Sequence, residues 1–264
     1  MRSPGRTSVL IGRRVVVTRA AEQAEGLCRA LEALGAVAVR CPTIRLAPPA
    51  RWDELDGALA RLAAYDWVLF TSANGVRFTL ERMSDHGLGG ADLPGARVGA
   101  VGSRTAKALI GFGVEPAFVA PDEGSMPLAE ALLPIEGVSV LMARSDRSDP
   151  VAAEILRRRG ARRVDEVVAY RTIPTAPSGG DLEDVRRGAD AVTFTSPSTV
   201  QGFVLLGPEW RGLLSGAIVA SLGPTTSAAA RAEGMEVRVE ATERTMAGLV
   251  EALARGFRDG EISS

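Results

Sequence analysis

The chain has 264 residues, of which 46% are hydrophobic and 24% charged, and its formal net charge is −1. This composition excludes a disordered chain or a fibre, and the near-zero charge argues against a general nucleic-acid binder while leaving an anionic small molecule open. The length allows one large domain or two ordinary ones. Lys107 is the sole lysine among many arginines, a bias more typical of a GC-rich genome than of a function.

Residue types that usually carry metal or nucleophilic chemistry are scarce. The cysteines are Cys28 and Cys41, without a CxxC motif, and the one histidine, His86, lies in a glycine-rich segment that we expect to be a solvated loop. A zinc site, a haem ligand and a histidine-centred triad are therefore not expected. The first residues lack the apolar region of a signal peptide, and no run of about 18 apolar residues could span a bilayer, so we expect a cytoplasmic protein that makes no membrane contact.

Short runs of β-branched and aromatic residues alternate with apolar stripes at helical spacing. The predicted strands are Arg14–Arg19, Val37–Arg40, Trp67–Phe70, Arg97–Val101, Ala117–Ala120, Val138–Ser145, Val164–Val168, Ala191–Thr195 and one near Ile218. The first predicted helix carries the stripe Leu27, Ala30, Leu31 and Leu34 and ends at Gly35, the second carries Val76, Thr79, Leu80 and Met83, and the third carries Ala106, Leu109 and Ile110. Two more are predicted at Leu128–Leu133 and at Val151–Gly160, the latter starting after Asp149 and Pro150. Another carries Val200, Phe203 and Val204 with Ser198 as its N-cap, and the last begins at Met246. The alternation predicts parallel sheets with right-handed crossovers.

The chain also repeats itself. VLFTSANGV, starting at Val68, and VTFTSPSTV, starting at Val192, share one pattern 124 positions apart (192 − 68). The segments that end at Gly35 and Gly160 match with nearly the same offset, 125 positions (160 − 35). We therefore predict a tandem duplication in which each repeat supplies about five strands.

Two proline-bearing extended segments, near 43–46 and 169–174, follow the second strand of each repeat. This position favours an exchange, in which the opening strand–helix–strand unit of each repeat completes the sheet of the other. Two sequential domains remain the simpler alternative. The predicted domains are 1–42 with 175–264, and 47–168, each an α/β three-layer, flavodoxin-like parallel sheet, joined by a two-stranded β ladder of the two segments.

Small polar residues recur where predicted strands end and helices begin, which is where open α/β sheets bind ligands. Backbone N–H groups and the helix dipole favour anions there, although Ser and Thr at such turns are as readily simple helix caps. Arg19 and Arg144, at matched strand ends, suit carboxylates or phosphates, or else lie solvated at the surface. The candidate substrate-binding residues are Arg19, Ser72, Asn74, Gly102, Ser103, Thr105, Arg144, Thr195, Ser196, Pro197, Ser198, Gly223, Thr225 and Thr226. Neither a dinucleotide fingerprint nor a Walker motif is present.

Tyr170 is one of two tyrosines and lies in the second extended segment. A phenol there could act as a weak acid to a leaving group, donate a hydrogen bond to a ligand, or merely pack against the segment. The first two uses make Tyr170 the candidate catalytic residue.

Over about residues 13–257 these motifs resemble the uroporphyrinogen-III synthase family. The resemblance rests on VVVTR, VLFTSANGV, VGSRT, AYRT, FTSPST and, above all, LGPTTSAAARAEG. It implies two α/β domains with the site in the cleft between them, and the linear tetrapyrrole hydroxymethylbilane, which carries multiple carboxylates, as substrate. The ring would close with loss of water and inversion of the last pyrrole through a spirocyclic intermediate, as a step of tetrapyrrole biosynthesis.

The resemblance also implies a monomer that uses no metal or organic cofactor and makes a transient contact with the preceding enzyme of the pathway. Tyr170 would assist departure of the hydroxyl group, and Thr105, Ser196 and Thr226 would line the cleft. Two other classes stay open. A two-lobed small-molecule binding module would share the lobes and linkers, but the export signal is missing and the GPTT motif is present. A sugar-nucleotide transferase would need a longer chain and a histidine or acidic pair.

Overall fold

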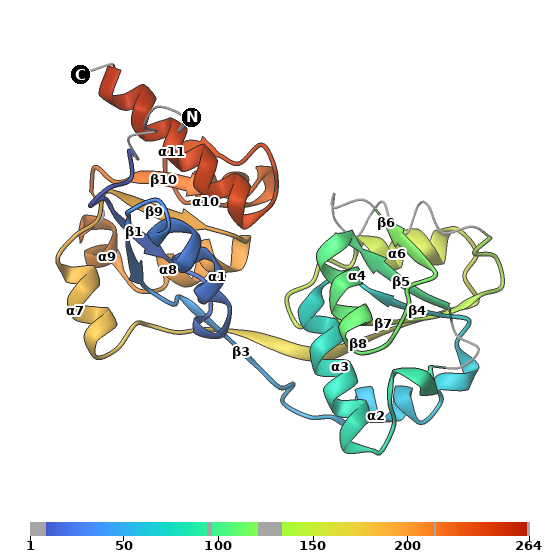
Figure 1. Cartoon of the computed structure of the whole chain (residues 1–264). Coiled ribbons are helices and arrows are strands. Elements are labelled where there is room, and N and C mark those ends of the chain that lie inside the picture. The colour runs from blue at the N-terminus through green and yellow to red at the C-terminus, as the bar shows by residue number, and fades with distance from the viewer. Residues whose placement is uncertain (1–8, 94–96, 121–133, 214, 263–264) are drawn as a thin grey trace, which may run out of the picture. The chain divides into compact units, whose positions relative to one another are not determined.

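The computed structural model describes residues 9–93, 97–120, 134–213 and 215–262 (Figure 1). The chain divides into two compact units. The first contains the chain up to Arg45 and from Ile173 onward, and the second runs Leu46–Thr172. The helix predicted at Leu128–Leu133 lies outside the described residues.

The sheet of the first unit is parallel and has the order β11-β10-β9-β1-β2. Its strands are β1 (Arg14–Val17), β2 (Val37–Arg40), β9 (Ala191–Phe194), β10 (Ile218–Ser221) and β11 (Val237–Glu240). The opening strand β1 pairs with β9, with Val16 opposite Val192. The first strand–helix–strand segment therefore completes the sheet whose other three strands come from the last part of the chain.

The second sheet has the order β3-β8-β7-β4-β5-β6, and its strands belong to the second unit except for the first two residues of β3 and the last two of β8. Its strands are β3 (Ile44–Ala47), β4 (Trp67–Phe70), β5 (Arg97–Val101), β6 (Phe118–Ala120), β7 (Ser139–Ser145) and β8 (Arg163–Pro174). Here β7 and β8 take the places that β1 and β2 take in the first sheet, so five strands of this sheet match the five strands of the first, and β3 is an additional edge strand beside β8. With the exchanged pair counted first, the five matched strands of each sheet follow the flavodoxin-like order 2-1-3-4-5. The predicted α/β class with parallel sheets and an exchange is confirmed.

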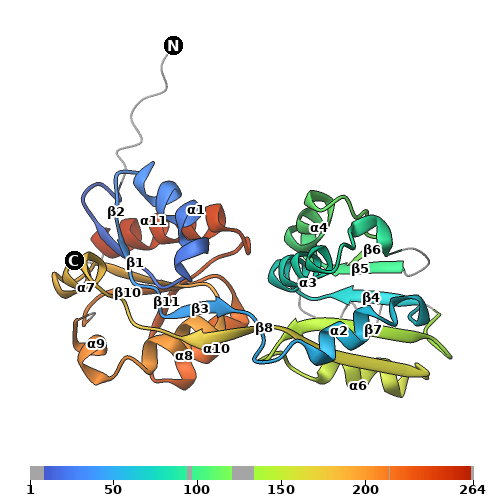
Figure 2. The same cartoon turned by 90° about the horizontal axis from the view of Figure 1, so that it is seen from below.

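Alternate residues of each strand face opposite helical layers, as the strand period of two requires. In the first unit Val15 and Val17 pack in the core formed with α1 (Ala21–Glu32) and α11 (Met246–Ile262). Val16 between them packs in the core on the other face, which contains residues of the remaining helices. These are α7 (Gly180–Arg186), α8 (Pro197–Val204), α9 (Pro208–Leu213) and α10 (Pro224–Ala232). Figure 2 shows the resulting three layers.

The second unit is layered in the same way. Phe70 and Leu141 face a core shared with α2 (Asp53–Leu59), α3 (Ala73–Asp85) and α4 (Gly102–Gly111), whereas Leu69 and Met142 face the core that contains residues of α6 (Val151–Arg158). Two single turns, Leu62–Ala64 and Gly90–Asp92, precede β4 and β5.

Several elements differ from the sequence predictions. The helices α2, α7 and α9 were not predicted. The strand predicted at Val164–Val168 continues to Pro174, so the second extended segment is part of β8 rather than a separate linker. The outer members of two predicted stripes, Leu34 and Ile110, are exposed by 36% and 51%. Leu34 lies beyond α1, which ends at Glu32, and Ile110 lies in the last turn of α4, next to the fully buried Leu109.

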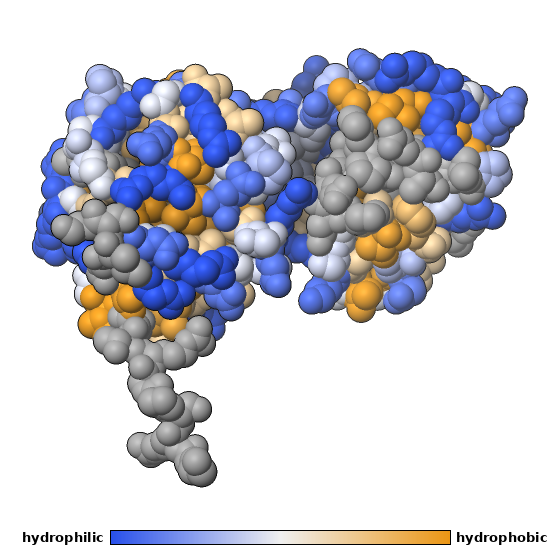
Figure 3. All heavy atoms as spheres, turned by 90° about the horizontal axis from the view of Figure 1, so that it is seen from above, coloured by the Kyte–Doolittle hydropathy of each residue, from blue (hydrophilic) through white to orange (hydrophobic). Residues whose placement is uncertain are grey.

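Figure 3 shows one face of each unit, on which hydrophobic residues form patches interrupted by hydrophilic ones. Such scattered exposure is ordinary for a globular surface. Among the described residues, no helix is both long and apolar enough to cross a membrane.

Candidate functional site

The strand order creates one switch point in each sheet, between β1 and β9 in the first unit and between β7 and β4 in the second. Open parallel sheets bind ligands beside such a point, at the carboxyl ends of the strands. The predicted site residues follow these ends: Arg19 after β1, Thr195–Ser198 after β9, Arg144 near the end of β7, and Ser72 with Asn74 after β4.

In the first unit Ser196 is the N-cap of α8. Its Oγ accepts the Thr199 N–H at 3.3 Å, and Thr199 Oγ1 in turn accepts the Ser196 N–H at 3.3 Å. Pro197 occupies the first helical position, which its fixed φ favours. The sequence prediction of Ser198 as the cap is therefore wrong, since Ser198 already lies within the first turn. Thr195, Ser196, Pro197 and Ser198 are all half-buried.

Beneath this turn a group of buried threonines ties the strand ends together. Thr18 donates to the carbonyl of Thr193 at 2.7 Å, and Thr193 donates to the carbonyl of Val16 at 2.8 Å. The Thr43 hydroxyl lies 2.9 Å from the carbonyl oxygen of Thr199 and 3.1 Å from that of Thr18. All four side chains are nearly or fully buried, so these hydrogen bonds hold the β1–β9 end as a rigid platform.

Arg19 is 6% exposed and folds onto the first turn of α1. Its guanidinium donates to Gln23 Oε1 at 2.9 Å and to the Gln23 carbonyl at 3.2 Å, and it lies 3.6 Å from the sulfur of Met246. These contacts fix a positive charge beside the carboxyl end of β1.

In the second unit Ser72 is the N-cap of α3 and accepts the Gly75 N–H at 3.0 Å. Asn74 lies in the first helical turn and is half-buried. Gly75 itself allows α3 to approach β7, because a Cβ there would lie 2.8 Å from the carbonyl oxygen of Ala143.

Tyr170, on β8, reaches the same corner. It is 6% exposed, and its hydroxyl lies 3.2 Å from Ser72 Oγ. Its ring stacks on Phe78 of α3, with the centroids 5.4 Å apart and the planes 11° from parallel. The candidate catalytic phenol is thus held on two sides by α3.

Arg144 already has partners within the protein. Its guanidinium forms an ion pair with Glu166 at 2.5 Å and donates to the Ser148 carbonyl at 2.9 Å, and only 9% of the side chain is exposed. A substrate carboxylate would have to share this arginine with Glu166.

The glycine turns after β5 and β10 open the helices α4 and α10. Gly102 has a φ of 75°, which glycine adopts readily. The N-cap residues of these helices, Val101 and Gly223, make no side-chain capping hydrogen bond of the kind that Ser72 and Ser196 make. Ser103 and Thr225 are exposed, whereas Thr105 and Thr226 are 3% and 5% exposed. Each turn therefore presents backbone N–H groups with a nearby hydroxyl, which is the donor set that a carboxylate accepts.

The sequence reasoning missed the residues that support the second of these turns. Ser221 and Ser227 are fully buried, and their hydroxyl oxygens lie 2.5 Å apart. Ser227 donates in turn to Glu240 at the end of β11. The two serines flank the GPTT motif and could have been noticed, but no local signal connects Glu240 to them.

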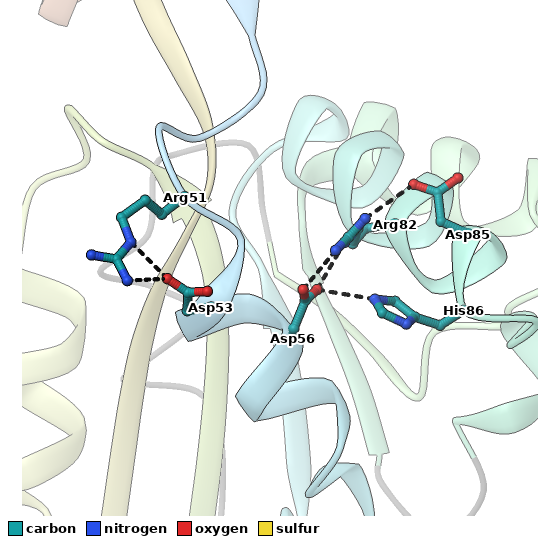
Figure 4. A network of polar contacts seen from close by, with 6 residues as sticks. All are labelled: Arg51, Asp53, Asp56, Arg82, Asp85 and His86. Carbon is teal, nitrogen blue, oxygen red and sulfur yellow. Dashed lines mark hydrogen bonds and ion pairs between the residues drawn. The ribbon is translucent and has the colours of Figure 1, made fainter.

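The single histidine lies away from these corners. Figure 4 shows Asp56 of α2 held by Arg82 and His86. Arg82 donates to both carboxylate oxygens, at 2.8 and 2.6 Å, and these hydrogen bonds lower the pKa of Asp56. His86 Nε2 lies 3.2 Å from the same carboxylate, and its side chain is 44% exposed. It follows the last turn of α3, about 20 Å along the helix from Ser72, so this network joins α2 to α3.

The cysteines are buried core residues. Burial raises the pKa of Cys28, and it raises the pKa of Cys41 to about 12, so neither is poised as a thiolate nucleophile. No group of three or more His, Cys, Asp and Glu side chains suited to a metal ion occurs in the part of the chain that the structure describes.

Comparison with known proteins gives one consistent family. Residues 25–251 match the family model described as HEM4: Uroporphyrinogen-III synthase HemD. A uroporphyrinogen-III synthase of Synechococcus elongatus is 32% identical over 258 residues, which cover 94% of this chain and 97% of the relative. That of Chlorobaculum parvum is 31% identical over 237 residues, which cover 85% and 91%.

Solved structures agree in fold. A uroporphyrinogen III synthase mutant from the extremely thermophilic bacterium Thermus thermophilus superimposes with a TM-score of 0.66 at 21% identity, covering 94% of this chain and all of that one. The Helicobacter pylori enzyme gives 0.62 at 18% identity, covering 92% and 99%.

Proposed function

Because the chain belongs to the uroporphyrinogen-III synthase family, we propose that it converts hydroxymethylbilane into uroporphyrinogen III. The observation that carries the proposal is the extent of the match, which includes 94% of the chain at 32% identity to a curated synthase. The enzyme is a lyase-type cyclase that uses no cofactor, and the reaction is a step of tetrapyrrole biosynthesis.

In the proposed reaction the C–O bond of the terminal hydroxymethyl group breaks, and its electron pair leaves with the oxygen. The oxygen takes up a proton and departs as water. The resulting cation is attacked by a pyrrole carbon, through a spirocyclic intermediate, and the ring closes with the last pyrrole inverted. The proton that the substrate loses on closure balances the one taken up by the leaving oxygen.

Catalysis is then mainly a matter of holding a flexible chain in one folded shape. We assign the substrate's carboxylates to the uncapped N-termini of α4 and α10, with Gly102, Ser103 and Thr105 at one and Gly223, Thr225 and Thr226 at the other. Backbone N–H groups and the positive end of the helix dipole favour carboxylates without a buried counter-charge. Arg19, Asn74 and the turn Thr195–Ser198 are further candidate donors at the same edges of the sheets.

We assign proton transfer to the leaving oxygen to Tyr170. It is a phenol held at the carboxyl end of its sheet by Ser72 and Phe78, and a phenol is a weak acid suited to general-acid assistance. Arg144 is a weaker candidate for substrate binding because Glu166 already neutralises it.

The proposal includes action as a cytoplasmic monomer and a transient contact with the enzyme that supplies the substrate. Such a contact would limit uncatalysed closure of the linear chain. Sedimentation of the chain alone and with that enzyme checks both points, since a stable oligomer of the chain alone would rule out the monomer.

The function is tested by the product isomer. Purified protein is incubated with hydroxymethylbilane, the product is oxidised, and the type I and type III porphyrins are separated by chromatography. We expect type III in excess without added metal or cofactor. Type I alone, as in a buffer control, would overturn the proposal and favour a protein that only binds small molecules.

A further inference from the structure

We infer that Ser72 is a positioning residue for Tyr170, and that its hydroxyl donates to the phenol oxygen while Tyr170 gives its own proton to the leaving group. The inference rests on the proposed role of Tyr170 in the reaction. It assigns to Ser72 a part in the chemistry in place of, or beside, the contact with substrate that its sequence position suggests.

The Ser72 hydroxyl is oriented by its role as a helix cap. Ser72 Oγ has one proton to donate and two lone pairs with which to accept. One lone pair takes the Gly75 N–H at 3.0 Å, because Ser72 is the N-cap of α3. That bond fixes the side chain and leaves its proton directed elsewhere. The Tyr170 oxygen, at 3.2 Å, is within reach of that proton.

The Tyr170 side chain is held at both its ring and its hydroxyl group. Tyr170 is 6% exposed, and its ring stacks on Phe78, which is itself 7% exposed. The stack restricts rotation of the ring, and Ser72 fixes the hydroxyl end. Both contacts come from α3, six positions apart (78 − 72). One helix therefore places the phenol oxygen, and a hydrogen bond accepted from Ser72 leaves the phenol proton free to point away from the protein core.

In the proposed reaction a negative charge develops on the Tyr170 oxygen. When the substrate's C–O bond breaks, its electron pair leaves with the oxygen, Tyr170 transfers its proton to that oxygen, and water departs. The phenol becomes a phenolate until the proton lost on ring closure returns to it. A hydrogen bond donated to the phenolate stabilises the charged form, and the positive end of the α3 dipole adds to this. Ser72 brings both to the same atom.

Kinetics of four proteins test the inference: the wild type, Ser72→Ala, Tyr170→Phe and the double variant. We expect each single change to lower kcat for type III formation by roughly tenfold with KM within about twofold, because the hydrogen bond strengthens as negative charge develops on the phenol in the transition state. The double variant should be no slower than Tyr170→Phe, since Ser72 acts through the hydroxyl that Phe lacks. Ser72→Thr, which keeps the hydroxyl and the cap, should restore most of the rate.

Loss of the helix cap is separated from loss of the donor by two further variants. Ser72→Gly removes the hydroxyl, but glycine is nearly as good an N-cap, so it should fold as the wild type and be as slow as Ser72→Ala. Ser196→Ala removes the matched cap of α8. The fold-change in rate that Ser196→Ala causes should multiply with the fold-change that Tyr170→Phe causes.

The outcomes are distinct. If Tyr170→Phe is slow while Ser72→Ala is as fast as the wild type, or if their effects multiply, the inference is wrong and the role of Tyr170 stands. If Tyr170→Phe is as fast as the wild type, the proposed role of Tyr170 fails and the inference fails with it, while type III product would still support the cyclase function.

Discussion

Gly202 of α8 lies so close to the segment after β2 that a side chain would not fit. A Cβ at this position would be 2.3 Å from the carbonyl oxygen of Thr43 and 3.0 Å from Ile44 Cγ2. The same carbonyl accepts the Thr175 N–H at 3.0 Å, and the Thr43 hydroxyl bonds to the platform beneath Ser196. Gly202 therefore lets α8 pack against the backbone at the switch point of the first sheet.

We predict that Gly202→Ala lowers the free energy of unfolding by roughly 1–3 kcal/mol, because the backbone must shift to admit the methyl group. The matched control is Gly26→Ala in α1, where nothing lies within 4 Å of the added Cβ. That change should raise the free energy of unfolding by about 0.5–1 kcal/mol, as alanine suits a helix interior better than glycine. Urea unfolding measures both, and equal stability of the two variants would contradict the close approach.

At the scale of single residues, the sequence predicts only some of the contacts at the candidate site. The linker position of Tyr170 was enough to single it out, and the repeated FTS turns led to Ser72 and Ser196. The pairing of Tyr170 with Ser72 could not be predicted, because the two are 98 positions apart (170 − 72) and no pattern connects them. The same holds for Arg144 and Glu166, where a matched strand end suggested a free cation but the neighbouring strand β8 supplies its partner.

At the scale of elements, the two FTS turns show how a helix start is decided. Ser196 and Ser72 occupy matched positions and both cap their helices, with extended backbone and an Oγ that accepts the N–H three residues later. Choosing Ser198 from the sequence overlooked Pro197, which is preferred just inside a helix and so makes the residue before it the cap.

The two serines predict a measurable contrast. Ser196→Ala should lower the free energy of unfolding by about 1 kcal/mol, because the Thr199 N–H loses its acceptor. Ser198→Ala, in the first turn of the helix, should change it by no more than about 0.5 kcal/mol. Thermal or urea unfolding of the two variants gives the comparison. A larger loss for Ser198→Ala would mean that α8 begins at Ser198 after all.

The contact between α2 and α3 should depend on pH. Arg82 lowers the pKa of Asp56 by donating hydrogen bonds to it. A carboxyl group whose pKa is lower in the folded protein adds stability above its unfolded value, near 3.9, and loses it as the pH falls through the folded value. Asp56→Asn should therefore be less stable than the wild type at pH 7, by up to about 1 kcal/mol for this partly exposed pair.

The difference between Asp56→Asn and the wild type should shrink as the pH is lowered towards 3. Asp85→Asn is the control, because Asp85 pairs with the same arginine at 3.5 Å but is 66% exposed, so it should change stability little at either pH. A gap between Asp56→Asn and the wild type that does not depend on pH would show that packing rather than charge holds α2.

Short helices were the hardest elements to predict from the sequence. The helices α2, α7 and α9 have seven, seven and six residues. A 3.6-residue period becomes visible only over two or three turns, so these helices are too short to show it. The central strands β1, β4 and β9 were easier because nearly all of their residues are buried and apolar. Strand β8 was cut short in the prediction because its outer half carries Tyr170, Arg171 and Thr172, and because Pro174 indicates extended chain without saying whether it pairs.

At the scale of the whole molecule, the duplication and the exchange followed from the sequence because both depend on order along the chain rather than on contacts. An offset of about 124 residues recurs in turns, strands and glycine stops, and the extended segments fall inside the repeats. Five strands of the two sheets then match, with β1 and β2 in one taking the places of β7 and β8 in the other, and β3 is added at the edge of the second sheet. Such a sheet has one switch point, so the positions of the candidate site residues follow from the topology.

The cyclase function is tested most sharply by the isomer composition of the product as the protein concentration is raised at fixed hydroxymethylbilane. Uncatalysed closure competes in every sample and gives the type I isomer. We expect the type III fraction to rise with protein concentration, towards a product that is nearly all type III. A protein that only binds the linear chain would slow its disappearance and leave type I as the sole product at every concentration, and that result would contradict the account.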